Sequence, residues 1–323
     1  MALQLSDRWI WDFWFAQENK DFHVFYLQAP KTLGDSERRH WHASIGHAVS
    51  QDLFDWRVLP DAIVANHEPS WDDLATWTGS IIQHDGLWYL FYTGISKQEQ
   101  GCVQRIGLAI SEDLIHWRRH GRDPVIEPNN NSYALLGDNG QLDQAWRDPW
   151  VFRDPDDGSF HAYITARASS GCEGAGVIAH ATSEDLLTWK ALPPVTVPMG
   201  FGQMEVPQLI SAGDAWYLLF CSDIATQDKH RRTGPGTGTY YLKAASSYGP
   251  FLSDSLRSLE ADCTGSRYAG KIVETNHSLK FLSWESVDTK GNFVGRITDP
   301  KAVEVDVNGE LKLSVMKQHS HDN

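Results

Sequence analysis

The sequence predicts an all-β protein folded as a five-bladed β-propeller, and three observations lead to this prediction. A turn followed by an aromatic-rich strand occurs five times along the 323 residues. A strand of small and apolar residues, which leads through Asp-Leu to a tryptophan, recurs between these copies. The copies lie about 55–75 residues apart, enough for a four-stranded blade, and helical periodicity is absent. This large and roughly even period disfavours a β-sandwich or a β-helix.

The aromatic strands give the order of the blades along the chain. We expect them at 21–26, 86–92, 158–164, 213–220 and 276–284. The second phrase adds a further strand at 45–50, 106–111 and 177–183, with a degenerate copy at 241–246. In the first three copies an Asp-Leu turn leads into Trp56, Trp117 and Trp189, which start the next strand.

The last blade is expected to end in a hairpin. Strands at 303–307 and 311–315 flank Asn308-Gly309, a dipeptide typical of hairpin turns. We therefore expect a single propeller domain over residues 1–316 and a polar tail over 317–323. His319 and His321 in that tail indicate a solvated end rather than a metal site.

Bulk composition excludes several classes of partner. The net charge of −14 makes nucleic acid and anionic membranes poor partners. The cysteines show no CxxC spacing and are expected to be free thiols: Cys102, Cys172, Cys221 and Cys263. Neither a signal-peptide pattern nor an apolar run of membrane-span length occurs, so we expect a cytoplasmic protein that is a monomer or a small homo-oligomer.

Three carboxylates carry the candidate chemistry. Asp12, Asp148 and Glu205 each lie in a short aromatic or proline-bounded motif that precedes the aromatic strand of its blade. Equivalent positions in different blades converge on the propeller axis, so the three can face one another. Cleavage of a glycosidic bond needs one carboxyl group as acid and another as nucleophile or base, and clustered carboxylates raise one another's pKa. A turn residue or an ion-pair partner is the alternative for any single one of them.

Together with further motifs, these residues resemble glycoside hydrolase family 32, which contains invertases, inulinases and levanases. The resemblance rests on five motifs in family order: 25–30 (Phe-Tyr-Leu-Gln-Ala-Pro), 46–56, 77–80 (Trp-Thr-Gly-Ser), 147–149 (Arg-Asp-Pro) and 205–209 (Glu-Val-Pro-Gln-Leu). It implies a retaining fructosidase without a metal or an organic cofactor, acting on a small carbohydrate. Asp12 would be the nucleophile, Glu205 the acid/base, and Asp148 a partner of the fructose hydroxyls.

The same resemblance implies which residues line the sugar pocket, namely Gln28, Trp77, Ser80 and Arg147. We add Trp11, Trp14 and Trp41 to the substrate-binding residues, because aromatic rings stack well on the apolar faces of sugars. In a retaining enzyme the carboxyl groups of nucleophile and acid should lie about 5–5.5 Å apart.

The chain departs from the family pattern at three points. The first motif reads Trp11-Asp12-Phe13-Trp14, which is similar to the Trp-Asp-x-Trp of the levansucrase family, a related propeller of fructosyl transferases. Val206 stands where the family usually has a cysteine after the acid/base. The C-terminal β-sandwich usual in family 32 is not expected. The first departure leaves the substrate and the acceptor open.

Two basic segments stand out in this acidic protein, 38–42 and 229–232. Arginine clusters can hold a phosphate, so a phosphorylated disaccharide is one possible substrate, although two solvated loops are the favoured interpretation. The glycines at 234–238 indicate a flexible loop rather than a phosphate-binding loop.

The sequence thus predicts a β-fructofuranosidase-like glycoside hydrolase that cleaves sucrose or short fructosides through a covalent intermediate. Three alternatives stay open. One is an inverting arabinofuranosidase or xylosidase like those of glycoside hydrolase family 43, another is a fructosyltransferase, and the third is a non-catalytic sugar-binding propeller. The three matched carboxylates argue against the last, because binding alone does not need two facing carboxylates.

Overall fold

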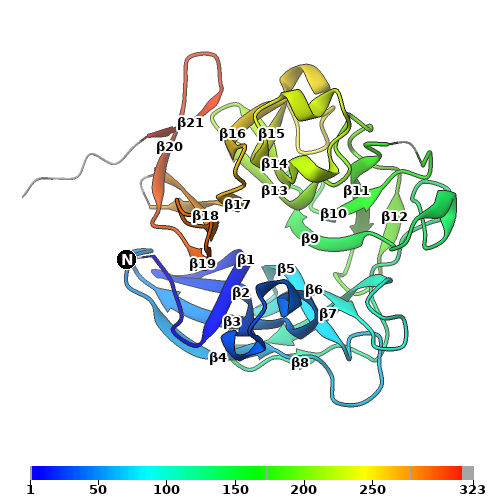
Figure 1. The fold of residues 1–323 in the computed structure, drawn as a ribbon, viewed down its shortest axis with the longest axis vertical. Coiled ribbons are helices and arrows are strands. Elements are labelled where there is room, and N and C mark those ends of the chain that lie inside the picture. Colours follow the sequence, from blue (N-terminus) through cyan, green and yellow to red (C-terminus); the bar gives the residue numbers. More distant parts are fainter. Residues whose placement is uncertain (1, 172, 277, 315–323) are drawn as a thin grey trace, which may run out of the picture.

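Five β-sheets are arranged as blades around a central axis in the computed structural model, which describes residues 2–171, 173–276 and 278–314 (Figure 1). The first four blades are four-stranded, and the chain runs through them in sequence order. Their strands are β1 (Arg8–Glu18), β2 (Asp21–Pro30), β3 (Ser44–Ser50), β4 (Arg57–Ile63), β5 (Ala75–His84), β6 (Leu87–Ile95), β7 (Gln104–Ser111), β8 (Arg118–Arg119), β9 (Trp146–Arg153), β10 (Phe160–Arg167), β11 (Gly176–Ser183), β12 (Lys190–Leu192), β13 (Glu205–Ala212), β14 (Ala215–Ser222), β15 (Thr237–Ala244) and β16 (Arg257–Asp262).

The fifth blade closes the ring. It contains β17 (Arg267–Thr275), β18 (Ser278–Val287), β19 (Phe293–Ile297), β20 (Lys301–Val305) and β21 (Leu311–Ser314), where β19 and β20 share the edge of β18. Leu3, which is buried, forms an isolated antiparallel bridge with Ile297 of β19. The start of the described chain is therefore tied to the last blade. The expected five-bladed, all-β architecture is confirmed, and the described residues contain no β-sandwich beside the propeller.

Helical structure within the described residues is limited to short 3₁₀ helices in the loops. These are η1 (Lys31–Leu33), η2 (Ser36–His42), η3 (Asp138–Gly140), η4 (Ile224–Thr226), η5 (Arg231–Thr233) and η6 (Ser253–Ser255). None of the helices in the described part of the chain is long and apolar enough to cross a membrane.

The recurring Asp-Leu motif of the sequence forms the same turn in each of the first three blades. After β3, the Asp52 carboxylate accepts hydrogen bonds from the backbone N–H groups of Phe54 and Asp55, and Leu53 takes a left-handed φ of 67°. Leu114 and Leu186 adopt the same conformation, each with φ 63°, in the corresponding turns of the next two blades. The leucines are buried, so the hydrogen-bonded aspartate and the burial of the leucine together offset the backbone strain.

The hairpin expected at the end of the chain is present. Its strands are β20 and β21, and the intervening Asp306 carboxylate accepts hydrogen bonds from the N–H groups of Asn308 and Glu310. Val315, Cys172 and the tail with His319 and His321 lie outside the described residues.

The innermost strands position the site because each carries a β-bulge near its beginning. The pairing register shifts at Asp12 in β1, at Thr78 in β5, after Glu205 in β13 and after Tyr268 in β17, and β9 shifts at Asp148 against β10. A bulge bends its strand and changes the direction of a side chain, and bulges are frequent beside active sites. The inner strands contact one another around the axis, so the five bulges form one ring.

Candidate active site

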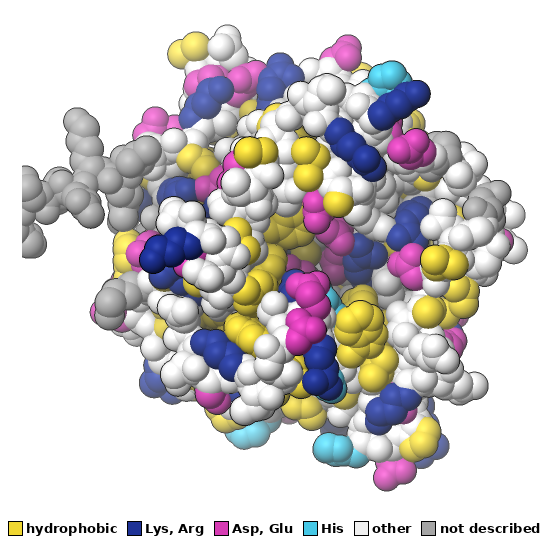
Figure 2. All heavy atoms as spheres, viewed as in Figure 1, with side chains coloured by type: hydrophobic (Ala, Val, Ile, Leu, Met, Phe, Trp, Pro, Cys, Tyr) yellow, Lys and Arg dark blue, Asp and Glu magenta, His cyan; other side chains and the backbone are white. Residues whose placement is uncertain are grey.

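A cavity of about 680 Å³ opens at the end of the axis where the bulges lie. Figure 2 shows this face with a hollow near its centre, where acidic and hydrophobic side chains gather. Asp12 from blade 1, Asp148 from blade 3 and Glu205 from blade 4 all line the cavity. The structure therefore brings together the three carboxylates that the sequence analysis identified, although Asp12 and Glu205 are 193 residues apart in the chain.

Asp12 accepts a hydrogen bond from the hydroxyl of Thr78, with 2.9 Å between Oγ1 and Oδ2. Burial raises the pKa of the Asp12 carboxyl to about 7, and the charges of Asp148 and Glu205 add to this rise. The Thr78 hydroxyl acts in the opposite direction and lowers the pKa. The carboxyl thus changes its charge close to neutral pH.

Asp148 is buried, with 5% of its surface exposed, and its backbone has a left-handed φ of 55°. Its Oδ2 accepts hydrogen bonds from the Thr165 hydroxyl at 3.0 Å and from the Val206 N–H at 3.1 Å. Burial raises the pKa of the Asp148 carboxyl, although the neighbouring Arg147 opposes this shift. These two hydrogen bonds hold the Asp148 side chain in place. The bond from the Val206 N–H also joins blade 3 to blade 4.

Glu205 has a donor on each carboxyl oxygen. Arg147 Nη2 lies 2.5 Å from Oε1, and the Tyr268 hydroxyl donates to Oε2. Arg147 also donates to the side-chain oxygens of Gln104 and Gln203, at 3.1 Å each. Burial alone would lower the pKa of Arg147, but the Glu205 and Asp148 carboxylates outweigh it and raise the pKa.

Lys271 is buried outside the cavity lining and holds the bulge that follows Glu205. Its side chain is 2% exposed, and Nζ donates to the carbonyl oxygens of Val206 at 2.5 Å and Pro207 at 3.1 Å. Burial lowers the pKa of the Lys271 amine to about 8, against the attraction of neighbouring acidic groups. Val206 has a left-handed φ of 46°, a costly conformation for a β-branched residue that these hydrogen bonds help to maintain.

Sequence reasoning missed Thr78, Tyr268 and Lys271. One signal could have found Thr78 and Tyr268, because both lie at the bulges of inner strands. Thr78 takes the repeat position of Asp12, and Tyr268 takes that of Glu205. Lys271 could have been noticed as a cation in the middle of a strand whose residues 269–273 are all buried.

Three of the predicted substrate-binding residues line the cavity, namely Trp11, Trp77 and Arg147. Trp77 is held by a hydrogen bond of 2.7 Å from its indole N–H to the carbonyl oxygen of His40. Trp41 is 49% exposed and lies outside the cavity lining.

The other three predicted substrate-binding residues face the core. Trp14 is fully buried and stacks on Phe25, with 6.2 Å between ring centroids. Ser80 is 1% exposed and accepts a hydrogen bond from the Val151 N–H. Gln28 is 2% exposed and donates to Asp61 at 2.7 Å. The structure thus places Trp14, Ser80 and Gln28 away from the cavity, because their side chains pack between strands.

The arginines of the two basic segments are occupied by the protein itself. Arg39 is 7% exposed and lies over the rings of Trp11, Trp284 and Phe293, and its Nη1 contacts the Glu37 carboxylate at 3.0 Å. In the second segment both guanidinium groups donate to backbone carbonyl oxygens, those of residues 199, 225 and 227. The second segment does not contribute to the cavity lining.

No cluster of three or more His, Cys, Asp or Glu side chains among the described residues has an arrangement that could hold a metal ion. Cys102, Cys221 and Cys263 are free thiols, as expected.

Comparison with known proteins adds a family and a set of relatives. A model of the glycosyl hydrolases family 32 N-terminal domain matches residues 13–299. A β-fructofuranosidase of Arabidopsis thaliana, insoluble isoenzyme CWINV6, is 24% identical over 311 residues, which are 90% of this chain and 54% of that protein. A sucrose-6-phosphate hydrolase of Escherichia coli is 26% identical over 219 residues, which are 64% of this chain and 39% of that protein.

Among solved structures, the inulosucrase from Halalkalicoccus jeotgali bound to kestose has a similar fold. The TM-score is 0.80 at 21% sequence identity, and the match covers 96% of this chain and 87% of that one. The likeness in structure extends over the whole propeller, whereas the chain spans only about half the length of the Arabidopsis relative.

Proposed function

The chain belongs to glycosyl hydrolase family 32, and from this premise we propose that it is a retaining β-fructofuranosidase that cleaves sucrose or a short fructoside. The observation that carries the proposal is the convergence of Asp12, Asp148 and Glu205, from three separate blades, on one cavity. An acid and a nucleophile facing each other are what the cleavage of a glycosidic bond requires.

The proposed reaction proceeds in two steps. Glu205 donates its proton to the glycosidic oxygen while the Asp12 carboxylate attacks the anomeric carbon, so the bond to the leaving alcohol breaks and a fructosyl ester of Asp12 forms. Glu205 then takes a proton from water, whose oxygen attacks the same carbon and releases fructose with retained configuration. Asp148 accepts hydrogen bonds from fructose hydroxyls, and these strengthen as positive charge develops on the ring.

Glu205→Ala is the test of this assignment. Sucrose hydrolysis should fall by several orders of magnitude because its leaving group needs the proton. A fructoside with a leaving group of low pKa should still form the fructosyl-enzyme and then stall. Azide needs no general base, so it should restore turnover and yield a fructosyl azide of retained configuration. Equal losses on both substrates, without a response to azide, would show that Glu205 is not the acid/base.

The charges of the cavity support an unphosphorylated substrate. Glu37, Asp143 and Asp223 line it in addition to the three central carboxylates. The two guanidinium groups at the cavity, Arg39 and Arg147, already contact carboxylates. A phosphate would therefore meet net negative charge, and we expect kcat/KM for sucrose to exceed that for sucrose 6-phosphate. The reverse order would contradict this part of the proposal.

Fructosyl transfer is the second candidate function, because the Trp11-Asp12-Phe13-Trp14 motif is similar to that of the levansucrase family. The two activities share the fructosyl-enzyme and differ in the acceptor that enters the second step. Product analysis at high sucrose concentration separates them, since a transferase makes tri- and higher saccharides while a hydrolase releases equal amounts of glucose and fructose.

A cytoplasmic location is part of the proposal. It is supported by the free thiols of the described cysteines, because thiols persist in reducing compartments. The state of monomer or small homo-oligomer stays a prediction, which size-exclusion chromatography with light scattering would test.

A further inference from the structure

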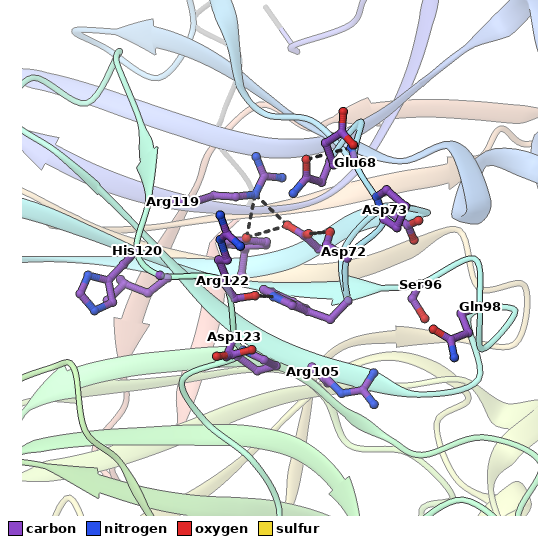
Figure 3. Close-up of a pocket in the computed structure, with 18 of the residues that line it drawn as sticks. Glu68, Asp72, Asp73, Ser96, Gln98, Arg105, Arg119, His120, Arg122 and Asp123 are labelled. Carbon is purple, nitrogen blue, oxygen red and sulfur yellow. Dashed lines mark hydrogen bonds and ion pairs between the residues drawn. The ribbon is translucent and has the colours of Figure 1, made fainter.

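A second cavity, of about 940 Å³, lies beside blade 2. Its walls come from the connection between β4 and β5, from β6, β7 and the connection between them, and from the residues between β8 and Pro124 (Figure 3). Within the described residues it shares no lining residue with the active-site cavity. The two are neighbours across the start of β7, where Gln104 lines the active site and Arg105 lines the second cavity.

A buried carboxylate fixes the walls of this cavity. Asp72 is 1% exposed and accepts hydrogen bonds from Arg119 Nε at 2.7 Å, the Tyr92 hydroxyl at 2.8 Å and the Ser70 hydroxyl at 2.6 Å. Arg119 also donates to the carbonyl oxygen of Val64. Figure 3 shows Arg119 directed at Asp72 inside the cavity. Because the β4–β5 connection, β6 and β8 meet at one paired carboxylate, the cavity is preformed rather than assembled by a ligand.

Trp71 supplies an aromatic wall. Its ring stacks on Tyr92 with 5.6 Å between centroids, and its indole N–H donates to the carbonyl oxygen of Arg122 at 3.1 Å. The ring lies so close to Gly94 and Gly107 that a Cβ on either residue would come within 2.3 Å of it. The glycines therefore let the indole lie flat on the blade, where it stays partly exposed to the cavity.

Polar side chains of both charge signs stand at the rim without a protein partner. Glu68, Gln98, Arg122 and Asp123 are exposed, line the cavity and make no side-chain hydrogen bond or ion pair to any described residue. The other two cations are paired, Arg119 with Asp72 and Arg105 with Glu99, the latter through two contacts of 2.5 and 2.7 Å. The rim thus offers unused hydrogen-bond donors and acceptors of both charge signs.

We propose that this cavity is a second carbohydrate-binding site, which takes an uncharged saccharide. A partly exposed indole can cover the apolar face of a sugar ring, and amide, carboxylate and guanidinium groups can pair with its hydroxyls. A preformed cavity with a few convergent polar groups is typical of small-molecule sites. An anion would meet an excess of negative charge, because the lining carries five carboxylates against three guanidinium groups. The proposal rests on the proposed function only in its choice of sugar, a fructose oligomer.

The site would hold a longer chain close to the active site. A fructose oligomer bound beside blade 2 keeps its ends at a high local concentration next to the catalytic cavity, across β7. Sucrose is too short to use both sites. The second site should therefore affect long substrates and leave sucrose unaffected.

Binding is measured by calorimetric titration of inulin oligomers into the Asp12→Asn protein, which should not turn the ligand over. Two classes of site are expected. Combining Gln98→Ala, Arg122→Ala and Asp123→Ala in the same background should abolish one class or weaken it about tenfold, the effect of losing one or two hydrogen bonds. The matched control replaces Glu112 and Arg118, which are exposed on the same blade outside the cavity, and should keep both classes.

The kinetic arm uses the same three rim substitutions with Asp12 intact. kcat/KM for inulin oligomers should fall while that for sucrose stays unchanged. A single class of site in the Asp12→Asn protein, unchanged binding after the rim substitutions, or displacement of the saccharide from this site by inorganic phosphate would overturn the proposal. Failure to cleave any fructoside would instead count against the proposed function, because the binding titration does not depend on turnover.

Discussion

Among the neighbours of Asp12, the Thr78 hydroxyl contributes most to lowering the pKa of its carboxyl. The proposed nucleophile must be an anion, yet burial and two neighbouring carboxylates raise its pKa to about 7. Thr78 provides a hydrogen bond that lowers this pKa. Since kcat/KM reports the pKa values of the free enzyme, its acid limb should lie near neutral pH, with activity rising as Asp12 loses its proton.

Thr78→Val should move that acid limb to higher pH. Valine keeps the volume of threonine but cannot donate to Asp12, so the carboxylate loses a stabilising contact and its pKa rises further. kcat/KM for sucrose should fall most at pH 6 and recover towards pH 8. Thr182→Val, which removes a hydroxyl bound to the Phe160 carbonyl oxygen away from the cavity, is the control. A uniform loss at every pH would contradict this role.

Lys271 is a positioning residue for Glu205, and Lys271→Met should reveal this. The substitution leaves the carbonyl oxygens of Val206 and Pro207 buried without a donor, so the bulge loosens and Glu205 is less well placed. kcat for sucrose should fall at least about tenfold with little change in KM, while an activated fructoside should suffer less because it needs no proton. Lys280→Met on β18 is the control. Equal losses on both substrates would contradict the positioning of Glu205 and would indicate an effect through the fold or through Asp12, whose pKa Lys271 also lowers.

At the scale of elements, blades 1 and 3 share a buried histidine pair that blade 2 lacks. His23 Nδ1 lies 2.9 Å from His47 Nε2, and His161 Nδ1 lies 2.8 Å from His180 Nε2. The register of the repeat puts Tyr89 and Leu108 at the same positions of blade 2. Burial lowers the pKa of all four histidines, that of His47 to about 3 and that of His180 to about 4.

These pairs should make the fold sensitive to mild acid. The unfolded chain binds protons below pH 6.5, whereas the folded chain keeps the rings neutral, so stability falls as the pH drops from about 6.5 to about 4. His23→Tyr combined with His47→Leu, the residues of blade 2, should flatten the dependence of the melting temperature on pH in this window. Carboxylates with a lowered pKa, such as Asp113, contribute to the pH dependence of stability only at lower pH. An unchanged slope between pH 6.5 and 4 would exclude the pair as its source.

The bulges also explain where reasoning from the sequence succeeded and where it did not. Period, turns and carboxylate motifs predicted the blades and the convergence of Asp12, Asp148 and Glu205. Trp14 and Ser80 follow Asp12 and Thr78 by two residues, and regular alternation would have put each pair on one face. The bulges at Asp12 and Thr78 break that alternation, so Trp14 and Ser80 point into the core. Tyr268 reaches Glu205 across 63 residues, a contact that no local pattern encodes.

At the scale of the whole molecule, the segment around Leu3 adds to the closure of the ring, where β1 already contacts β17, β18 and β19. Leu3 is 5% exposed and bridges to Ile297, and the Ile297 N–H donates to the Leu3 carbonyl oxygen at 3.0 Å. Leu3→Ala should lower the free energy of unfolding by about 2–3 kcal/mol, because it leaves a gap between blades 1 and 5. Urea denaturation measures this, and Gln4→Ala, at the exposed neighbouring position, is the control. A loss below about 0.5 kcal/mol would mean that this side chain does not hold the ring together.

The closure has a consequence for how the protein matures. The Glu205 carboxyl accepts a hydrogen bond from Tyr268 of the last blade, whereas Asp12 belongs to the first blade. Leu3 pairs with Ile297, which is also in the last blade. A ribosome must therefore synthesise almost the whole propeller before the first and last blades can join. During refolding, enzymatic activity should accordingly recover in one late phase, after β-structure has formed. The recovery of activity therefore reports when the first and last blades join.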